Sequence, residues 1–417
     1  MQLKTILNHV ERHKSFVYQQ ARWMKDAKQP AIEIPVEPRA NSRPICSSCG
    51  KPASGYDRLQ PRRFEFVPLW QIRVFLVYAL RRVDCARCGV KVERVPWAHG
   101  KEHLTSSYRW FLAGWAKRLS WQGTAEAFQT TWEHVRDAVR HAVLWGLLHR
   151  DLSNVRAIGV DEICWRKGHH YLTLVYQIDA QCKRLLWVCE QRTEQGLRRF
   201  FDVFGGQILP TLEFVCSDMW LPYLNVIAAE AGQAIHVLDR FHIMKMLGEA
   251  IDEVRAGEAR RLKQDGYEPV LKHSRWCLLK RPENRTEKQT VKLAELLQYN
   301  LKSVRAHLHR EDFQRFWEYQ SPAWAGRFLD EWTNRVMRSQ LEPMKRVARS
   351  LRKHRELLLN WFRAKGTISA GTVEGFNNKA KLAMRKSYGF KTYDTAKLAL
   401  YHQLGSLPEP DFTHKFC

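Results

Sequence analysis

The segment AIGVDEICW, residues 157–165, places two adjacent carboxylates at the end of an apolar run. The apolar residues from 155 to 163 predict a β-strand, so Asp161 and Glu162 would bring negative charge to the border of a core. The chain as a whole carries the opposite charge, because 68 Lys and Arg against 43 Asp and Glu give a net charge of +25 over 417 residues. Two such acids need a cation nearby, and so basic a chain attracts polyanions, of which nucleic acid is the commonest large one.

The residues after this strand alternate between strand and helix patterns. Strands are expected at 171–179, 184–190, 212–218 and 233–239, and helices at 194–205 and 221–232. Three strands followed by helix, strand, helix and strand is the order of a ribonuclease H-like fold, in which the first and fourth strands are neighbours. Asp161, near the end of the first strand, and Asp218, at the end of the fourth, would then converge. A divalent cation such as Mg²⁺ would neutralise them.

A third carboxylate is expected from GTVEGFNNKAKLAMRKSYGF, residues 371–390. Glu374 would begin a helix, where the helix dipole favours an ionised acid. Asn378, Lys381 and Arg385 follow at i+4, i+7 and i+11 and would share its face, with Lys379 beside them. Such a face suits a phosphate backbone held near a metal ion. Taken alone, Glu374 also fits an ordinary acid in the first turn of a helix.

Two Cys-x-x-Cys-Gly motifs, CSSCG at 46–50 and CARCG at 85–89, predict a metal site nearer the N-terminus. Each pair can place two thiolates on one tetrahedral ion, and the glycine permits the tight turn that follows. Alternating Val74, Leu76 and Tyr78 predict a strand between the motifs, which together describe a zinc ribbon. The expected ligands of one structural Zn²⁺ are Cys46, Cys49, Cys85 and Cys88. Two unrelated pairs of buried cysteines are the alternative.

Between residues 106 and 145 the pattern becomes helical. Thr124 and Thr131 fit N-cap positions, and a helix, a short helix and a longer helix match a helix-turn-helix. The residues of the last helix expected to face inward are Trp132, Val135, Val139 and Val143. The outward residues expected to read a DNA major groove are His134, Arg136 and Arg140. An ordinary helical bundle is the alternative.

In this order the motifs resemble those of bacterial insertion-sequence transposases of the ISL3 family, which are of the DDE type. The matching pieces, which extend over nearly the whole chain, are the two CxxCG motifs, AIGVDE (157–162), VCSDMW (215–220), HVLDRFHIMK (236–245) and the helix segment 369–390. The resemblance implies that Asp161, Asp218 and Glu374 form the catalytic triad and hold two Mg²⁺ or Mn²⁺ ions. It also points to Asp239 and His242 as supporting residues. A polar pair that fixes a strand–helix turn is the alternative for these two.

The expected function is therefore that of a DNA transposase, which cuts insertion-sequence ends and joins them to target DNA. Its partner would be double-stranded DNA, and the pairing of two ends suggests at least a homodimer. A metal-dependent nuclease without joining activity, and a DNA-binding regulator on a decayed transposase scaffold, are the alternatives. No apolar run fits a membrane span or a signal peptide, so a cytoplasmic, nucleoid-associated bacterial protein is expected.

The expected architecture is multidomain α/β, with a catalytic core interrupted by helices. About 155 residues separate Asp218 from Glu374, and most of them keep helical spacing. The basic residues from 345 to 355 would line a DNA channel or form a solvated surface. The expected parts are an N-terminal region with the zinc ribbon (1–100, ribbon 46–89), a helix-turn-helix domain (101–150), the first part of the ribonuclease H-like core (151–244), an all-helical insertion (245–365), the final catalytic helix (366–405) and a tail (406–417).

Overall fold

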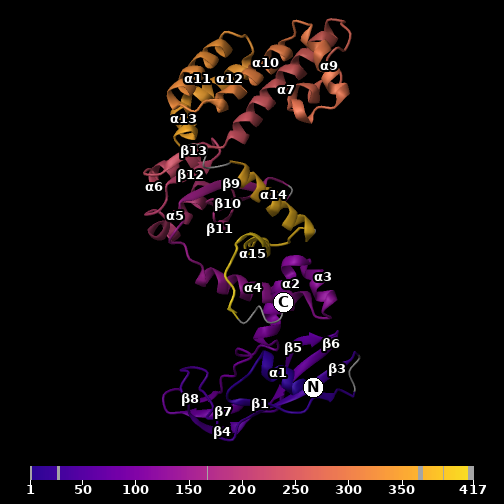
Figure 1. Cartoon of the computed structure of the whole chain (residues 1–417), viewed down its shortest axis with the longest axis vertical. Coiled ribbons are helices and arrows are strands. Elements are labelled where there is room, and N and C mark those ends of the chain that lie inside the picture. The colour runs from indigo at the N-terminus through magenta and orange to yellow at the C-terminus, as the bar shows by residue number, and fades with distance from the viewer. Residues whose placement is uncertain (1, 26–28, 167, 365–369, 388, 412–417) are drawn as a thin grey trace. The chain divides into compact units, whose positions relative to one another are not determined.

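The computed structural model describes residues 2–25, 29–166, 168–364, 370–387 and 389–411. The chain forms two compact units (Figure 1). The first unit combines Met1–Arg150 with Ala383–Cys417, and the second is Asp151–Leu382. The C-terminal segment therefore returns to the N-terminal unit, an arrangement that the expected linear series of parts did not include.

Two β-sheets build the N-terminal part of the first unit. One follows helix α1 (Leu3–Val10), has the order β1-β3-β6-β5, and carries β2 on β3. The other has the order β4-β7-β8, with Cys85 and Cys88 at the turn from β7 to β8 and Cys46 and Cys49 in the segment before β4. The strands are β1 (Phe16–Tyr18), β2 (Arg22–Trp23), β3 (Ala31–Pro38), β4 (Ser54–Arg58), β5 (Arg62–Leu69), β6 (Ile72–Tyr78), β7 (Arg81–Cys85) and β8 (Gly89–Val92).

The strand expected at Val74, Leu76 and Tyr78 is present as β6, and all three side chains are buried. It does not belong to the cysteine-bearing sheet, because it pairs with β3 from the N-terminal segment and with β5. A three-stranded ribbon is too small to bury these residues. Instead they extend a core around the fully buried Trp97, whose ring lies 4.8 Å from that of Phe16. The expectation that residues 46–89 form one ribbon is therefore wrong for residues 62–78.

Four helices complete the first unit, and α15 packs on α4. Thr131 caps α4 as expected, since its side chain accepts a hydrogen bond from the His134 amide. Thr124 is not a cap, because α3 begins earlier and is capped by Ser120. Val135 and Val139 are buried as expected, as is Val143, whereas Trp132 is half-buried. The helices are α2 (Ser106–Arg118), α3 (Trp121–Ala127), α4 (Trp132–His149) and α15 (Tyr393–Leu404).

A mixed five-stranded sheet in the order β11-β10-β9-β12-β13 forms the centre of the second unit. The first and fourth strands expected from the sequence, β9 and β12, are parallel neighbours, which confirms the predicted adjacency. Helices α5 and α6 pack on one face, where Phe200 and Tyr223 join Ile158 and Val160 in a buried core. The elements are β9 (Ala157–Arg166), β10 (His170–Ile178), β11 (Lys183–Glu190), α5 (Glu194–Ile208), β12 (Phe214–Ser217), α6 (Leu221–Glu230) and β13 (Ile235–Leu238).

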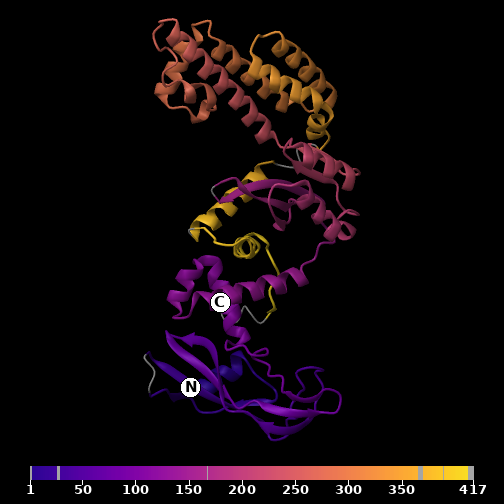
Figure 2. The same ribbon diagram turned by 180° about the vertical axis from the view of Figure 1, so that it is seen from behind.

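Helices gather into a bundle after β13 (Figures 1 and 2). Its core includes Ile251, Phe313, Trp332 and Leu351. Residues 239–364 are all described and contain no strand, as expected for this region. The elements are α7 (Arg240–Gln264), α8 (Arg275–Leu279), η1 (Pro282–Asn284), α9 (Glu287–Leu297), α10 (Lys302–Gln314), η2 (Arg315–Glu318), α11 (Pro322–Met337), α12 (Glu342–Lys353) and α13 (Arg355–Arg363).

The last helix of the second unit, α14 (Ala370–Lys386), returns to the sheet and continues into the first unit. It lies on the face of the sheet opposite α5 and α6, against β9 and β10 (Figures 1 and 2). Among the described residues, no helix is both long and apolar enough to span a membrane.

Candidate active site and metal centre

Asp161 lies inside β9, because that strand continues to Arg166. The strand thus continues three residues beyond Ile163, where the sequence pattern predicted its end. The pairing of β9 with β12 does end early, at Gly159 and Cys216, and beyond this point β9 pairs only with β10. Continuing the parallel register by two residues brings Asp161 beside Asp218, which directly follows β12. The two acids thus come together at the carboxyl edge of the shorter strand.

Arg192 supplies positive charge at this edge. Its Nη2 donates to Asp218 Oδ2 at 2.8 Å and lies 3.2 Å from Glu162 Oε1. The guanidinium also lies 4.4 Å from the ring centre of Trp220, whose backbone amide donates to Asp218 Oδ1. Sequence reasoning missed Arg192, because nothing in its local pattern separates it from the many other arginines. Glu162 was noted only as a neighbour, yet it takes part in the same ion-pair network.

Burial and mutual repulsion act strongly on these carboxylates. Asp161 is 6% exposed, and burial raises its pKa, with the negative charges of Asp239 and Asp218 adding to the effect. Burial also raises the pKa of Glu162 to about 7, helped by Asp218 and Asp161. Because burial and mutual repulsion disfavour ionisation of these carboxyl groups, a further cation beside them would stabilise their ionised form. Hard carboxylate oxygens at such a site fit Mg²⁺ or Mn²⁺.

Asp239 and His242 form a pair at the start of α7. Asp239 is the N-cap, since its Oδ1 accepts the Phe241 amide at 2.7 Å, and its Oδ2 lies 3.1 Å from His242 Nδ1. These contacts are those of a pair that fixes a strand–helix turn. Burial opposes protonation of His242, but the bond to Asp239 and the charges of Asp161, Asp239 and Asp218 raise its pKa to about 9. His242 is therefore a second cation beside the acids.

Helix α14 is attached to Asp161 by Asn377. This buried amide donates from Nδ2 to Asp161 Oδ2 at 2.5 Å and accepts from the Tyr176 hydroxyl at 3.0 Å. The other oxygen of Asp161 accepts the Glu162 amide at 2.8 Å. Sequence reasoning selected the next residue, Asn378, which is exposed. The apolar spacing of Val373, Phe376 and Ala380 indicated the packed face, and Asn377 lies on that face.

Close packing supports this attachment. A Cβ added at Gly159 would lie 2.5 Å from Val373 Cγ2, so α14 approaches β9 more closely than any larger residue would allow. The ring of Phe376 stacks on that of Tyr176 at 4.8 Å. Because Gly159 and Asp161 share one face of the strand, the helix is held directly over the acid.

Glu374 lies one helical turn before Asn377. The helix begins at Ala370, so Glu374 is not in its first turn, and the expected stabilisation by the helix dipole does not apply. Its side chain is half-buried and forms no hydrogen bond or ion pair with any described residue. The predicted phosphate-binding residues beyond it are all exposed, namely Asn378, Lys379, Lys381 and Arg385.

Asp161 and Asp218 thus meet at one edge of the sheet, whereas Glu374 is placed only by its position one helical turn from the residue that binds Asp161. Within the described ranges, the one group of three or more His, Cys, Asp or Glu ligand atoms close enough to hold a metal ion is the cysteine cluster. Its four sulfur atoms all lie within 4.8 Å of one another. The members are Cys46, Cys49, Cys85 and Cys88.

Local backbone geometry explains why the cysteines converge. Gly50 and Gly89 both have a φ of +69°, which permits the tight turn after each motif. Cys49 Sγ and Cys85 Sγ are 3.7 Å apart. A hydrogen bond from the backbone of Cys49, with a second from Ser48, lowers the pKa of the Cys46 thiol to about 7. Four converging thiols, one of them readily ionised, fit a structural Zn²⁺.

The three residues of α4 that were predicted to read a DNA groove lie in two different environments. His134 and Arg140 line a hollow of about 630 Å³ together with Arg109 and Asp137. Arg136 instead lies over the Trp132 ring at 5.6 Å and pairs with Asp137. The hollow thus contains acid as well as base.

The basic residues of 345–355 do not form an unpaired basic face. Most of them contact an acid or an amide, which lowers their attraction for a DNA backbone. The contacts are Arg346 with Glu253, Arg349 with Glu342, Arg352 with Asn334, and Arg355 with Asp330.

The sequence is similar to known transposases. A family model described as a transposase of the ISL3 type matches residues 158–400. The transposase for insertion sequence element IS1001 of Bordetella parapertussis is 28% identical over 376 residues, 89% of this chain and 91% of that protein. The transposase for IS1557 of Mycobacterium tuberculosis is 27% identical over 383 residues, 86% and 85% of the two chains. The chain belongs to the ISL3 family of transposases.

Proposed function

We propose that this protein is a DNA transposase that binds the ends of an insertion sequence, cleaves them and joins them to target DNA. Asp161, Asp218 and Glu374 are its catalytic acids, on a core of ribonuclease H-like type. The observation that carries the proposal is the bond from Asn377 to Asp161. It fixes the helix of the third acid onto the strand of the first, beside the second.

The acidic residues fit divalent cations. Glu162 Oε2 is buried and has no hydrogen-bond partner among the described residues, although its other oxygen pairs with Arg192. Asp161, Asp218 and Glu374 would hold Mg²⁺ or Mn²⁺. When bound, two such ions would activate water or a 3′-hydroxyl and stabilise the leaving oxygen of a phosphodiester. The bonds to Asn377 and to the Glu162 amide keep the Asp161 carboxylate in one orientation.

Exposed basic and amide side chains would bind the DNA. On α14, Asn378, Lys379, Lys381 and Arg385 would hold the phosphate backbone near the acids. In the helix-turn-helix formed by α2, α3 and α4, the major-groove residues would be His134, Arg136 and Arg140. Zn²⁺ on the four cysteines would be structural, since a closed set of thiolates leaves no open position. The protein would act as at least a homodimer on DNA. It would work in the bacterial cytoplasm, associated with the nucleoid.

End-cleavage and joining assays test this function. Wild-type protein with Mg²⁺ should nick DNA that carries the ends of its element and should join pre-cut ends to a target. Asp161→Asn and Glu374→Gln should bind the same ends but cleave them about a thousandfold more slowly, which corresponds to about 4 kcal/mol in the barrier. Asp202→Asn, on the exposed side of α5, is the matched control.

The same assays separate the alternatives. Cleavage without joining would identify a nuclease. End binding without cleavage by the wild type would identify a regulator on an inactive scaffold, and would contradict the proposed function.

A further inference from the structure

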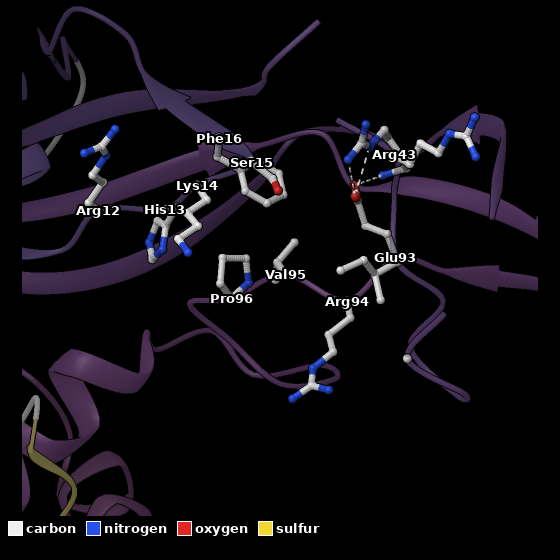
Figure 3. A pocket seen from close by; sticks show the side chains of 13 residues that line it. Arg12, His13, Lys14, Ser15, Phe16, Arg43, Glu93, Arg94, Val95 and Pro96 are labelled. Carbon is white, nitrogen blue, oxygen red and sulfur yellow. Dashed lines mark hydrogen bonds and ion pairs between the residues drawn. The ribbon is translucent and has the colours of Figure 1, made fainter. Parts of the chain in front are cut away.

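A cavity of about 490 Å³ lies beside the cysteine cluster in the first unit. Three segments line it together with Arg81: residues 12–16, which link α1 to β1, residues around Arg43 and Gly50, and residues 93–96 after β8. Figure 3 shows Arg12, Lys14, Arg43 and Arg94 distributed around this hollow. No motif recognised in the sequence includes these four residues.

The four cations have no acidic partner in the part of the chain that the structure describes. None of their side chains forms an ion pair or hydrogen bond with a described residue, and all four are exposed. Glu93 is the one acid among the lining residues, all of which lie in the described part of the chain. Arg81 neutralises it, with Nε donating to Glu93 Oε2 at 2.9 Å, and Figure 3 marks the contacts of Glu93. The net charge of the cavity wall is therefore strongly positive.

A buried donor or acceptor is also unused in this wall. His13 is 9% exposed, and its Nε2 forms no hydrogen bond with a described residue, although Glu11 Oε1 lies 3.9 Å from it. Its ring packs against Trp97 with centroids 5.3 Å apart, which fixes its orientation. Burial lowers the pKa of His13 to about 4, so the ring is neutral at pH 7. A neutral imidazole can donate one hydrogen bond to a phosphate or sugar oxygen.

We propose that this cavity binds the phosphodiester backbone of the insertion-sequence end. The proposal rests on the proposed function, because that function supplies the DNA. Four separate cations on three segments suit a row of phosphates better than one small anion, which is usually held by converging buried donors. The basic residues near α12 contrast with these, since acids of the same chain already pair with most of them.

The basic residues of the cavity could have a structural role in place of DNA binding. Ile45 and Gly50 of the cavity adjoin the motif that contains Cys46 and Cys49. Arg43 and Arg94 would then serve to stabilise the negative charge of the thiolates and their metal ion. This role predicts a change in zinc retention, whereas a role in DNA binding does not.

The test is the affinity of the full-length, zinc-loaded protein for end DNA, measured by fluorescence anisotropy at several salt concentrations. Arg43→Gln combined with Arg94→Gln should weaken binding about tenfold at low salt. It should also reduce the slope of log K against log salt by about 2, because each lost phosphate contact removes about 0.9. The matched control is Arg156→Gln with Arg198→Gln, which removes equal charge from arginines that are already paired with acids. The control should bind like the wild type.

Each other outcome overturns the proposal. A double variant that keeps its zinc and binds with the control's affinity and slope has lost no phosphate contact. Loss of zinc from the double variant would assign the two arginines to the metal site. Displacement of DNA by millimolar inorganic phosphate at constant ionic strength would indicate a small-anion site. Cleavage at saturating DNA should persist in the double variant, so the inference can fail while the proposed function stands.

Discussion

The cysteine cluster and the carboxylate site differ in how the chain assembles them. Cys49 and Cys85 are 36 residues apart, and each belongs to a motif whose own tight turn presents two sulfur atoms. Asp161 and Asn377 are 216 residues apart and meet only because α14 returns to β9. The first site is specified locally in two halves, whereas the second depends on the packing of the whole unit.

The two sites also differ in what balances their charge. The four sulfur atoms of the cysteine cluster lie within 4.8 Å of one another. Burial and the neighbouring sulfur atoms raise the pKa of Cys88 to about 12, so its ionisation requires a cation such as a metal ion. The carboxylates have Arg192 and His242 within the same unit. Under the proposed function, removal of zinc would unfold its site, whereas removal of Mg²⁺ would leave the carboxylate site folded and inactive.

The largest expected effect is that of breaking the cysteine cluster. Zinc contributes on the order of 10 kcal/mol to the folding of small zinc modules, which is comparable with the whole stability of a domain. Cys85→Ser should therefore lose its zinc, lose hydrogen-exchange protection over residues 46–58 and 81–92, which hold the cysteines and β4, β7 and β8, and bind end DNA more weakly. The second unit should keep its protection. Cys164→Ser, at an exposed cysteine, is the control. Full zinc content and unchanged end binding in Cys85→Ser would contradict a structural zinc site.

The next effect concerns the bond that assembles the carboxylate site. Asn377→Ala leaves the Tyr176 hydroxyl and one oxygen of Asp161 without their partner. The cleavage rate at saturating DNA should fall about 10- to 100-fold, as for other residues that orient metal ligands. Asn378→Ala, at the neighbouring exposed amide, should instead raise the DNA concentration needed for half-maximal rate. If both variants changed the same kinetic parameter, Asn377 would have no positioning role.

These two sites also show what the sequence could predict. The glycine-terminated motifs contain the turns that gather the sulfur atoms, so all four members of the cysteine cluster could be named in advance. The order of strands similarly predicted that β9 and β12 are neighbours. The sheet to which residues 62–78 belong could not be predicted in this way. The strand that pairs with β6 is β3, which comes from a segment with no recognisable motif.

The meeting of Asp161 and Asp218 could be predicted from the sequence, but not all of the residues that surround them could be. Asp161 and Asp218 stand out as acids beside apolar strands. Arg192 does not stand out, because only the fold decides which arginine reaches Asp218. Asn377 and Asn378 point about 100° apart around the helix, and the apolar spacing of the helix already indicated that Asn377 faces the sheet. Local patterns therefore indicate ligands more reliably than the residues that neutralise them.

Acid should destabilise the first unit through a buried histidine. Burial lowers the pKa of His402 in α15 to about 3, from an ordinary value of 6.5. The unfolded chain thus binds this proton first, and the stability it provides is lost as pH falls from about 6.5 toward 3. The folded protein should lose roughly 2 kcal/mol between pH 7 and pH 5 from this residue. In the second unit, burial raises the pKa of Asp161, so protonation relieves a cost there.

Denaturant unfolding at pH 7 and pH 5 measures this effect. His402→Leu should lose less stability than the wild type over the same interval, and the difference between the two proteins isolates His402 from the titration of the cysteines. Equal losses in both proteins would show that the buried imidazole does not control the acid response of the first unit.

The smallest effect concerns competition between Arg192 and a metal ion. Arg192 pairs with Asp218 and Glu162, two of the groups nearest the proposed ions, so a divalent cation must share or displace it. Arg192→Gln should lower the stability of the metal-free second unit and strengthen Mg²⁺ binding about tenfold, as measured by the shift of its thermal unfolding with Mg²⁺ concentration. Arg198→Gln, which breaks ion pairs on α5, should leave Mg²⁺ binding unchanged. Weaker Mg²⁺ binding in Arg192→Gln would mean that the arginine holds the acids in place for the metal. The carboxylate site would then resemble the cysteine cluster in one respect. In both sites the protein would hold the metal ligands in position before the ion binds.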